Sequence, residues 1–235
     1  MKKTILKINQ LLIKNFGVPP RAKKLPKPID LLIATILSQN TNDNNSYKAY
    51  QNLKKKFPSW DEVRMARRSS IEKEIKIAGL GYQKSKAIKN LLTELHEKEK
   101  SYSLSIVKKS SSTKAIEYLT NFKGIGVKTA SCVLLFALDR DVCPVDTHVH
   151  RTLNRIGLVK TNSPDKTFLQ INEKFPNGIA HSFHTNLIRL GREICTPRNY
   201  KCDNCPVVKI CKYDNKLFGN NSLNNKKSFM LLDSI

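Results

Sequence analysis

The sequence contains few acidic residues, few glycines and prolines, and no long apolar run. Asp and Glu number 19 against 42 Lys and Arg, which gives a formal net charge of +23. Nine glycines and ten prolines are too few for collagen, low-complexity repeats or turn-dense all-β folds. The longest apolar run, 132–138, is far shorter than the roughly 20 residues of a membrane-spanning helix. A 40% hydrophobic fraction still supports a buried core, and the charge predicts a polyanionic partner: nucleic acid or an anionic membrane surface.

The first residues begin like a secretory signal, but Lys7 and Lys14 interrupt the apolar region. The apolar residues of this segment share one helical face instead: Ile5, Ile8, Leu12 and Phe16. We therefore expect an N-terminal amphipathic helix and a cytoplasmic protein in a reducing environment. Structural disulfides are not expected there.

Helical periodicity dominates the chain, and strand signals are almost absent. Four segments have the apolar spacing of buried or half-buried helices: 29–37, 84–95, 115–119 and 127–138. A further helix is expected to start with a cap at 70–74 and to end near the glycines of 79–81. The alternating run 103–107 is too isolated to form a sheet. The fold class is therefore all-α, and 214–235 is expected to be a polar C-terminal tail in which 229–232 could dock.

A glycine-containing turn, Phe122-Lys123-Gly124-Ile125-Gly126, separates two expected helices. Two glycines one residue apart allow a tight turn with positive φ angles. Backbone N–H groups beside a helix N-terminus can hold a phosphate oxygen, which positions DNA without reading its sequence. The alternative is a simple tight connection between helices.

Lys128 follows in the first turn of the second helix. It is either one more solvated cation or a nucleophilic amine, because the positive end of the helix dipole disfavours a second positive charge. Asp146, in the segment Val145-Asp146-Thr147-His148, is a good N-cap for the next helix. Alternatively, Asp146 has a catalytic role, in which its carboxylate accepts a proton from Lys128 and stabilises positive charge on a sugar.

Four cysteines, Cys195, Cys202, Cys205 and Cys211, have the spacing C-x6-C-x2-C-x5-C. Such close thiols in a reducing compartment predict a metal site. The chemistry leaves two options, a four-thiolate zinc site and an iron–sulfur cluster. The spacing differs from the common zinc ribbon and from the usual ferredoxin patterns, so it does not by itself decide between them.

Taken together, these motifs resemble endonuclease III, the iron–sulfur member of the helix-hairpin-helix DNA glycosylase family. The segment 124–130 is similar to the hairpin with its catalytic lysine, 145–151 to the catalytic aspartate segment, and the cysteine spacing to the cluster signature. The segment 37–41 is similar to the helix end that carries an inserted amide, and 79–82 to the wedge loop. The similarity extends from about Ile29 to Cys211.

The resemblance implies a two-lobed fold. A six-helix barrel with the helix-hairpin-helix is expected at 25–138. A helical domain with a [4Fe-4S] cluster, ligated by the four cysteines, is expected to combine 1–24 with 139–213. The substrate cleft would lie between the lobes, with Lys128 and Asp146 as catalytic residues.

The resemblance also assigns DNA contacts. Gln39 or Asn40 fills the space left by the flipped nucleotide, and Leu80 wedges into the opposite strand. The hairpin residues Lys123, Gly124, Ile125 and Gly126 hold the phosphate backbone. The family usually has Leu-Pro before the glycines, where this chain has Phe122-Lys123. Alignment on Asp43 places Asn40 where the inserted glutamine usually lies, so the gap-filling residue stays open.

The implied activity is base excision repair by a bifunctional DNA glycosylase and AP lyase. A monomer would bind double-stranded DNA with an oxidised pyrimidine or abasic site, close to the nucleoid, and cut the strand by β-elimination through a lysine Schiff base. No membrane association is expected. One alternative is a thymine or uracil mismatch glycosylase of the same fold. Another is a non-enzymatic helix-hairpin-helix DNA-binding module with a four-cysteine metal site.

Overall fold

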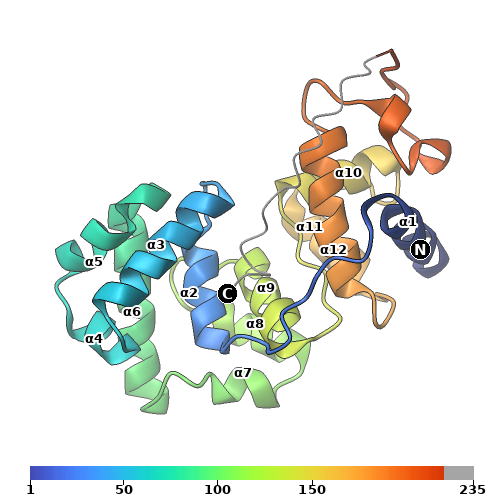
Figure 1. The fold of residues 1–235 in the computed structure, drawn as a ribbon. Helices are drawn as coiled ribbons and strands as arrows, with labels where there is room; N and C mark the ends of the chain where they lie inside the picture. Colours follow the sequence, from blue (N-terminus) through green and yellow to red (C-terminus); the bar gives the residue numbers. More distant parts are fainter. Residues whose placement is uncertain (220–235) are drawn as a thin grey trace. The chain divides into compact units, whose positions relative to one another are not determined.

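A computed structural model of the protein describes residues 1–219, and these residues are helical without any strand (Figure 1). They divide into two compact units. One unit is Ala22–Asp139, and the other joins Met1–Arg21 to the described residues from Arg140 onward. The all-α expectation is therefore confirmed for the described residues. The segment 229–232, which could dock, lies outside them.

The unit Ala22–Asp139 is built around α2, whose Pro28–Leu37 span is buried apart from the half-buried Asp30. Trp60 Nε1 donates a hydrogen bond to Asp30 Oδ1 over 2.8 Å, which satisfies this carboxylate at the edge of the core. Helix α2 packs against α3, α6 and α9. The helices of this unit after α2 are α3 (Asp43–Lys56), α4 (Trp60–Met65), α5 (Arg68–Ile75), the 3₁₀ turn η1 (Lys76–Ala78), α6 (Gly81–Glu99), α7 (Ser105–Lys109), α8 (Ser112–Thr120) and α9 (Val127–Leu138).

The helix expected at 127–138 has these bounds in the structure, but other boundaries differ from expectation. Helix α5 begins at Arg68 and has no side-chain cap at Arg67, so the predicted cap at 70–74 is wrong. Helix α6 extends from Gly81 to Glu99, beyond the predicted 84–95 at both ends. The alternating run around Ser105 is a short helix, α7, because Val107 is buried by packing that local alternation does not reveal.

The second unit contains α1 (Lys2–Phe16), α10 (Thr147–Ile156), α11 (Pro164–Asn172) and α12 (Ala180–Arg189). Helix α1 packs on α12 through the predicted face, where Ile5, Ile8 and Leu12 are fully buried. Helix α12 continues into a π-helical turn, η2 (Leu190–Ile194), and both pack against α10. Two 3₁₀ turns follow, η3 (Cys202–Asn204) and η4 (Val208–Ile210). This arrangement brings the end of α12 and the start of the cysteine segment beside α10.

Within residues 1–219, no helix combines the length and apolar character that crossing a lipid bilayer requires.

Candidate functional site

The hairpin between α8 and α9 is a tight turn closed by its own backbone. Ile125 N donates to Phe122 O over 3.1 Å, and Gly124 has a φ of +91°. That φ lies in the left-handed region, where glycine is favoured over residues with a Cβ. A Cβ on Gly124 would also lie 3.2 Å from Ala87 Cβ of α6, so the turn lies close to this helix. The predicted turn is therefore present, and its position depends on a close backbone approach.

The two glycines of the hairpin have different roles. Gly126 has a φ of −96° and is the extended N-cap residue of α9, so the expectation of positive φ at both glycines is wrong for this one. A Cβ there would meet no atom within 4 Å. Gly126 O accepts the first helical hydrogen bond of α9, from Ala130 N at 3.0 Å. The absence of a side chain at this position leaves the N-terminus of α9 open to an anion.

Gln39, two residues after the end of α2, is hydrogen-bonded to the hairpin. Its Nε2 donates to Gly124 O over 3.2 Å and lies 3.4 Å from Thr129 Oγ1 in α9. The neighbouring Asn40 is exposed and has a left-handed φ of +51°. The two candidates for the inserted amide are thus distinguished, since Gln39 is used within the protein and Asn40 faces solvent.

The predicted wedge loop lies between η1 and α6. Gly79 and Leu80 have φ angles of +70° and +50°, and the Leu80 side chain is 46% exposed. Sequence reasoning overlooked the lysine beneath this loop. Lys84 is buried, with 2% of its surface exposed, and its Nζ donates to Leu37 O and Ala78 O, each at 2.8 Å. The missed signal is that Lys84 falls on the apolar face of α6 with Ile88, Leu91 and Leu95.

The two predicted catalytic residues belong to different units. Lys128 is half-buried in the first turn of α9, two residues after Gly126. Asp146 is the N-cap of α10, and its Oδ1 accepts a hydrogen bond from Val149 N at 2.8 Å. The capping role expected for Asp146 is confirmed. The predicted pairing of Asp146 with Lys128 stays a prediction.

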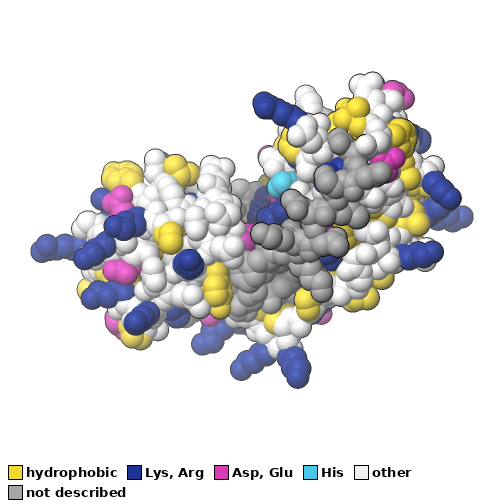
Figure 2. Space-filling view, turned by 45° about the horizontal axis from the view of Figure 1, so that its top comes forward, with side chains coloured by type: hydrophobic (Ala, Val, Ile, Leu, Met, Phe, Trp, Pro, Cys, Tyr) yellow, Lys and Arg dark blue, Asp and Glu magenta, His cyan; other side chains and the backbone are white. Residues whose placement is uncertain are grey.

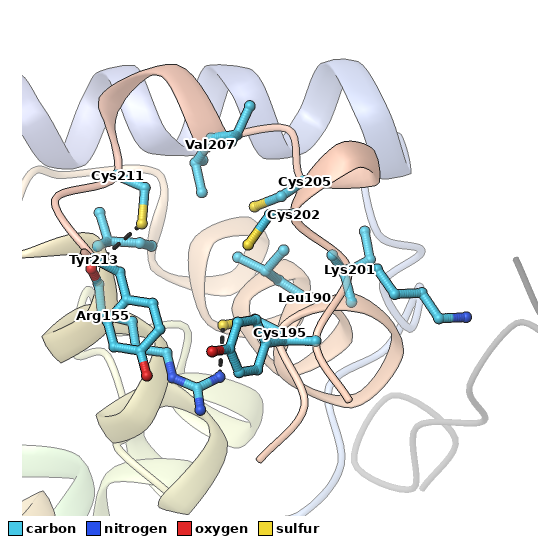
Figure 3. Close-up of a pocket in the computed structure, with 13 residues that line it drawn as sticks. Arg155, Leu190, Cys195, Lys201, Cys202, Cys205, Val207, Cys211 and Tyr213 are labelled. Carbon is cyan, nitrogen blue, oxygen red and sulfur yellow. Dashed lines mark hydrogen bonds between the residues drawn. The ribbon is translucent and has the colours of Figure 1, made fainter. Parts of the chain in front are cut away.

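The four predicted cysteine ligands surround one cavity in the second unit. Figure 3 shows the sulfurs of Cys195, Cys202, Cys205 and Cys211 directed toward this shared space. Burial raises the pKa of the Cys205 thiol to about 12 and that of Cys211 above its ordinary value. Burial thus disfavours the thiolate form of these two groups, an effect that a bound metal cation would oppose.

Arg155 of α10 is a cation beside these thiols that sequence reasoning did not identify. Its Nη1 lies 3.5 Å from Cys195 Sγ and 2.7 Å from Thr196 O, and the Cys211 thiol donates to Arg155 O over 3.3 Å. Its guanidinium stacks on Tyr200 and Tyr213, at 4.5 and 5.0 Å from the ring centroids. Thus Arg155 joins α10 to the cysteine segment and supports negative charge on sulfur.

The residues just after the last cysteine are bonded back onto the cysteine segment. Cys202 N donates to Leu217 O over 3.1 Å, and Gly219 N donates to Asp203 Oδ2 over 2.7 Å. Tyr200 Oη also donates to Asn215 O over 2.6 Å. The start of the predicted polar tail is therefore part of this unit, because these backbone groups complete the hydrogen bonds of the cysteine segment.

The four cysteines supply the donors of a metal site. Four thiolates can hold either a zinc ion or an iron–sulfur cluster. In the structure the four thiols line one cavity, a donor set that fits an iron–sulfur cluster. Among residues 1–219, no three His, Cys, Asp or Glu side chains are grouped closely enough to hold a metal ion.

The described surface is strongly basic. Figure 2 shows Lys and Arg side chains projecting from both units on the face in view, with few acidic side chains among them. In Ala22–Asp139, the exposed cations near the elements above include Lys123 in the hairpin, Lys86 in α6 and Lys76 in η1. Such a surface favours phosphate backbones in a salt-dependent manner.

Comparison with known proteins gives consistent matches. Residues 33–177 match the model of the HhH-GPD superfamily of base excision DNA repair proteins. Endonuclease III of Thermotoga maritima is 32% identical over 202 residues, covering 86% of this chain and 89% of that protein. A candidate DNA glycosylase of Arabidopsis thaliana is 38% identical over 193 residues, covering 79% of this chain, which spans only 63% of that plant protein. A solved structure of a trapped covalent intermediate of endonuclease III with DNA has a TM-score of 0.75 and 25% identity, covering 90% of this chain and 96% of the other.

Proposed function

Because the chain belongs to the HhH-GPD superfamily and its endonuclease III branch, we propose that it is a bifunctional DNA glycosylase and AP lyase acting on oxidised pyrimidines. The chain is a DNA-binding enzyme, a DNA glycosylase of base excision repair with the all-α endonuclease III fold. The proposal adds the lyase mechanism, the lesion, the action of a monomer and the residues involved. A location at the nucleoid in the cytoplasm stays a prediction.

The observation that carries the mechanism is the position of Lys128. It lies in the first turn of α9, directly after a hairpin whose backbone is suited to a phosphate, in a chain similar to a protein trapped covalently on DNA. A lysine amine is a nucleophile for sugar carbons and forms Schiff bases, which arginine or a solvated cation cannot do. The phosphate contact and the nucleophile are therefore adjacent in one structural element.

The proposed reaction begins with extrusion of the damaged nucleotide, which costs least for a weakly paired base. The neutral Lys128 amine attacks C1′ of the deoxyribose, the glycosidic bond breaks, and the base leaves as an anion that receives, through Asp146, the proton released by the amine. Asp146 stabilises the positive charge that develops on the sugar and takes the proton released by the amine. The sugar ring then opens to an imine on Lys128. Loss of a C2′ proton breaks the C3′–O bond, which is the β-elimination.

Cys195, Cys202, Cys205 and Cys211 would hold a [4Fe-4S] cluster, with the Arg155 guanidinium beside the sulfur of Cys195. When bound, such a cluster would cross-link the cysteine segment. The side chains of Lys201, Lys209 and Lys212 alternate with these ligands along the chain and would present cations to phosphates.

The mechanism is tested by reduction with borohydride on DNA that carries thymine glycol or an abasic site. Wild-type protein should become covalently attached, and Lys128→Ala should not. Lys123→Ala is the matched control, because it removes a neighbouring hairpin cation and should weaken binding while leaving attachment at saturating protein. Attachment that persists unchanged in Lys128→Ala refutes Lys128 as the nucleophile.

Substrate preference needs its own comparison. Cleavage of thymine-glycol duplexes should exceed cleavage of duplexes with G·T or G·U mismatches. The reverse order would assign the chain to the mismatch glycosylases of this fold. Binding without cleavage of either substrate would favour the non-enzymatic module.

The cofactor is tested by colour and metal content. Protein purified without oxygen should be yellow-brown with iron and sulfide in stoichiometric amounts, and Cys202→Ala should lose both. Cys132→Ala is the matched control, because Cys132 is a buried core residue of the other unit and should leave the colour unchanged. A colourless protein containing one zinc ion would overturn the cluster assignment.

A further inference from the structure

Lys84 lies under two of the segments that the proposed function places in DNA. Its Nζ donates one hydrogen bond to Leu37 O, at the last residue of α2, and one to Ala78 O, at the last residue of η1. Both bonds are 2.8 Å long, and the lysine side chain is 2% exposed. A single amine therefore links two chain segments that are far apart in the sequence.

Burial makes the charged form of Lys84 less favourable, and its two carbonyl acceptors offset this desolvation cost. Burial lowers the pKa of Lys84 to about 8, so the ammonium form still predominates at neutral pH. The carbonyl groups at helix ends carry partial negative charge and have no partner within the helix, so they are favourable acceptors for a buried cation. A buried cation without such acceptors would be strongly unfavourable. The position of Lys84 thus fixes both carbonyl groups relative to α6.

A residue with unusual backbone geometry follows each fixed carbonyl group within three positions. Asn40 follows Leu37 by three residues and has a φ of +51°, and Leu80 follows Ala78 by two residues and has a φ of +50°. Left-handed conformations are unfavourable for residues other than glycine and persist where the surroundings determine them. Asn40 and Leu80 are also both exposed. The Lys84 bonds lie where they can hold these two side chains in position.

We propose that Lys84 is a positioning residue that sets the spacing between the Asn40 segment and the Leu80 wedge, so that both enter the duplex together. This inference rests on the DNA-inserting roles in the proposed function, but not on Lys128 chemistry. Lys84 itself, being buried, touches neither DNA nor substrate. Its effect reaches DNA through the two carbonyl groups and the segments that follow them.

The test uses a duplex with tetrahydrofuran, an abasic analogue that cannot react with Lys128, placed opposite 2-aminopurine. Entry of both segments should unstack the 2-aminopurine and raise its fluorescence. Lys84→Met keeps the side-chain length and removes the donors. It should lower affinity for this duplex by about tenfold and reduce the fluorescence at saturation, with less than about a twofold change on undamaged DNA of the same length.

Lys89→Met is the matched control. Lys89 also lies on α6 and donates to two carbonyl groups, Arg64 O at 2.8 Å and Ala66 O at 2.5 Å, at the end of α4, a helix with no proposed DNA contact. This variant should keep wild-type affinity and fluorescence on both duplexes. If Lys84→Met behaves like wild type, or loses affinity equally for both duplexes, the proposal is overturned.

A second measurement covers the case in which Lys84→Met does not fold. Asn40→Ala and Leu80→Ala change exposed side chains, so their double-mutant cycle can be measured in the wild-type background. If the double variant differs by about threefold or more from the affinity expected for independent effects on the tetrahydrofuran duplex, the two side chains are positioned together. Additive effects on affinity overturn the proposal. Wild-type protein that raises the fluorescence but is not trapped by borohydride would refute the lyase mechanism alone. Wild-type protein that leaves the fluorescence unchanged would refute the positioning role.

Discussion

The side-chain amide of Gln39 donates to the carbonyl oxygen of Gly124 over 3.2 Å, which joins the end of α2 to the hairpin turn. The same nitrogen lies 3.4 Å from Thr129 Oγ1, one residue from Lys128. Gln39 therefore links the segment before the proposed inserted amide to the element that carries the proposed nucleophile. Asn40, exposed and next in the chain, is therefore our candidate for the inserted amide.

The first prediction separates these two amides. Asn40→Ala should lower affinity for tetrahydrofuran-containing duplex by about fivefold or more, with an unchanged melting temperature, because it removes a contact made only with DNA. Gln39→Ala should lower the melting temperature by about 2–4 °C, since it breaks a hydrogen bond within the protein worth roughly 1 kcal/mol. Thermal melting and fluorescence anisotropy measure both effects. The opposite pattern would make Gln39 the inserted residue.

The second prediction concerns the two hairpin glycines. Gly124→Ala should destabilise the fold by about 1–3 kcal/mol, because φ is +91° and the new Cβ would lie 3.2 Å from Ala87 Cβ. Gly126→Ala should change stability by less than about 0.5 kcal/mol, since its φ is −96° and its surroundings are open. Urea denaturation measures both. Equal destabilisation would show that Gly124 is not specially constrained.

The third prediction separates the two roles of Asp146. Asparagine is as good an N-cap as aspartate, so Asp146→Asn should keep the bond from Val149 N and nearly all of the stability. It should nevertheless reduce the rate of base release by about 10²–10⁴-fold, because the carboxylate charge is lost. Asp146→Ala should lose the same activity and about 1 kcal/mol of stability. Single-turnover kinetics with denaturation distinguishes these outcomes, and an active Asp146→Asn would leave Asp146 with the capping role alone.

The fourth prediction follows from the lowered pKa of Lys84. Its folded pKa of about 8 lies below its ordinary value of 10.5, so between these pH values the unfolded chain binds more protons than the folded one. The contribution of Lys84 to the free energy of unfolding should therefore rise with pH in this window and stay constant below it. The stability of wild-type protein relative to Lys84→Met should increase by roughly 2 kcal/mol from pH 8 to pH 10. Denaturation at both pH values measures this, and a flat or falling difference contradicts it.

Local sequence rules identified much of the fold. The bounds of α9, the buried face of α1 and the capping by Asp146 depend on spacing and residue type within a few positions, which the sequence displays directly. The four cysteines around one cavity were predictable for a similar reason, since their spacing is itself the signal.

The remaining features depend on contacts between distant segments. The conformation of Gly126 is determined by its place as the N-cap of α9, although its residue type permits positive φ as well as negative. The apolar face of α6 indicates that Lys84 is buried, but the partners of Lys84 and Arg155 are brought to them by tertiary packing. In so basic a chain, nothing in the residue type distinguishes these two cations from the solvated ones. The motifs in the sequence predict Lys128 and Asp146 as catalytic residues, and their joint action stays a prediction.

The hydrogen bonds that return from 215–219 to the cysteine segment have a practical consequence for anyone preparing this protein. Leu217 O accepts a hydrogen bond from Cys202 N, and Gly219 N donates one to the Asp203 side chain. A chain truncated directly after Cys211 would lose both hydrogen bonds. Affinity tags or fusion partners are therefore best joined beyond residue 219, where they leave this closure intact.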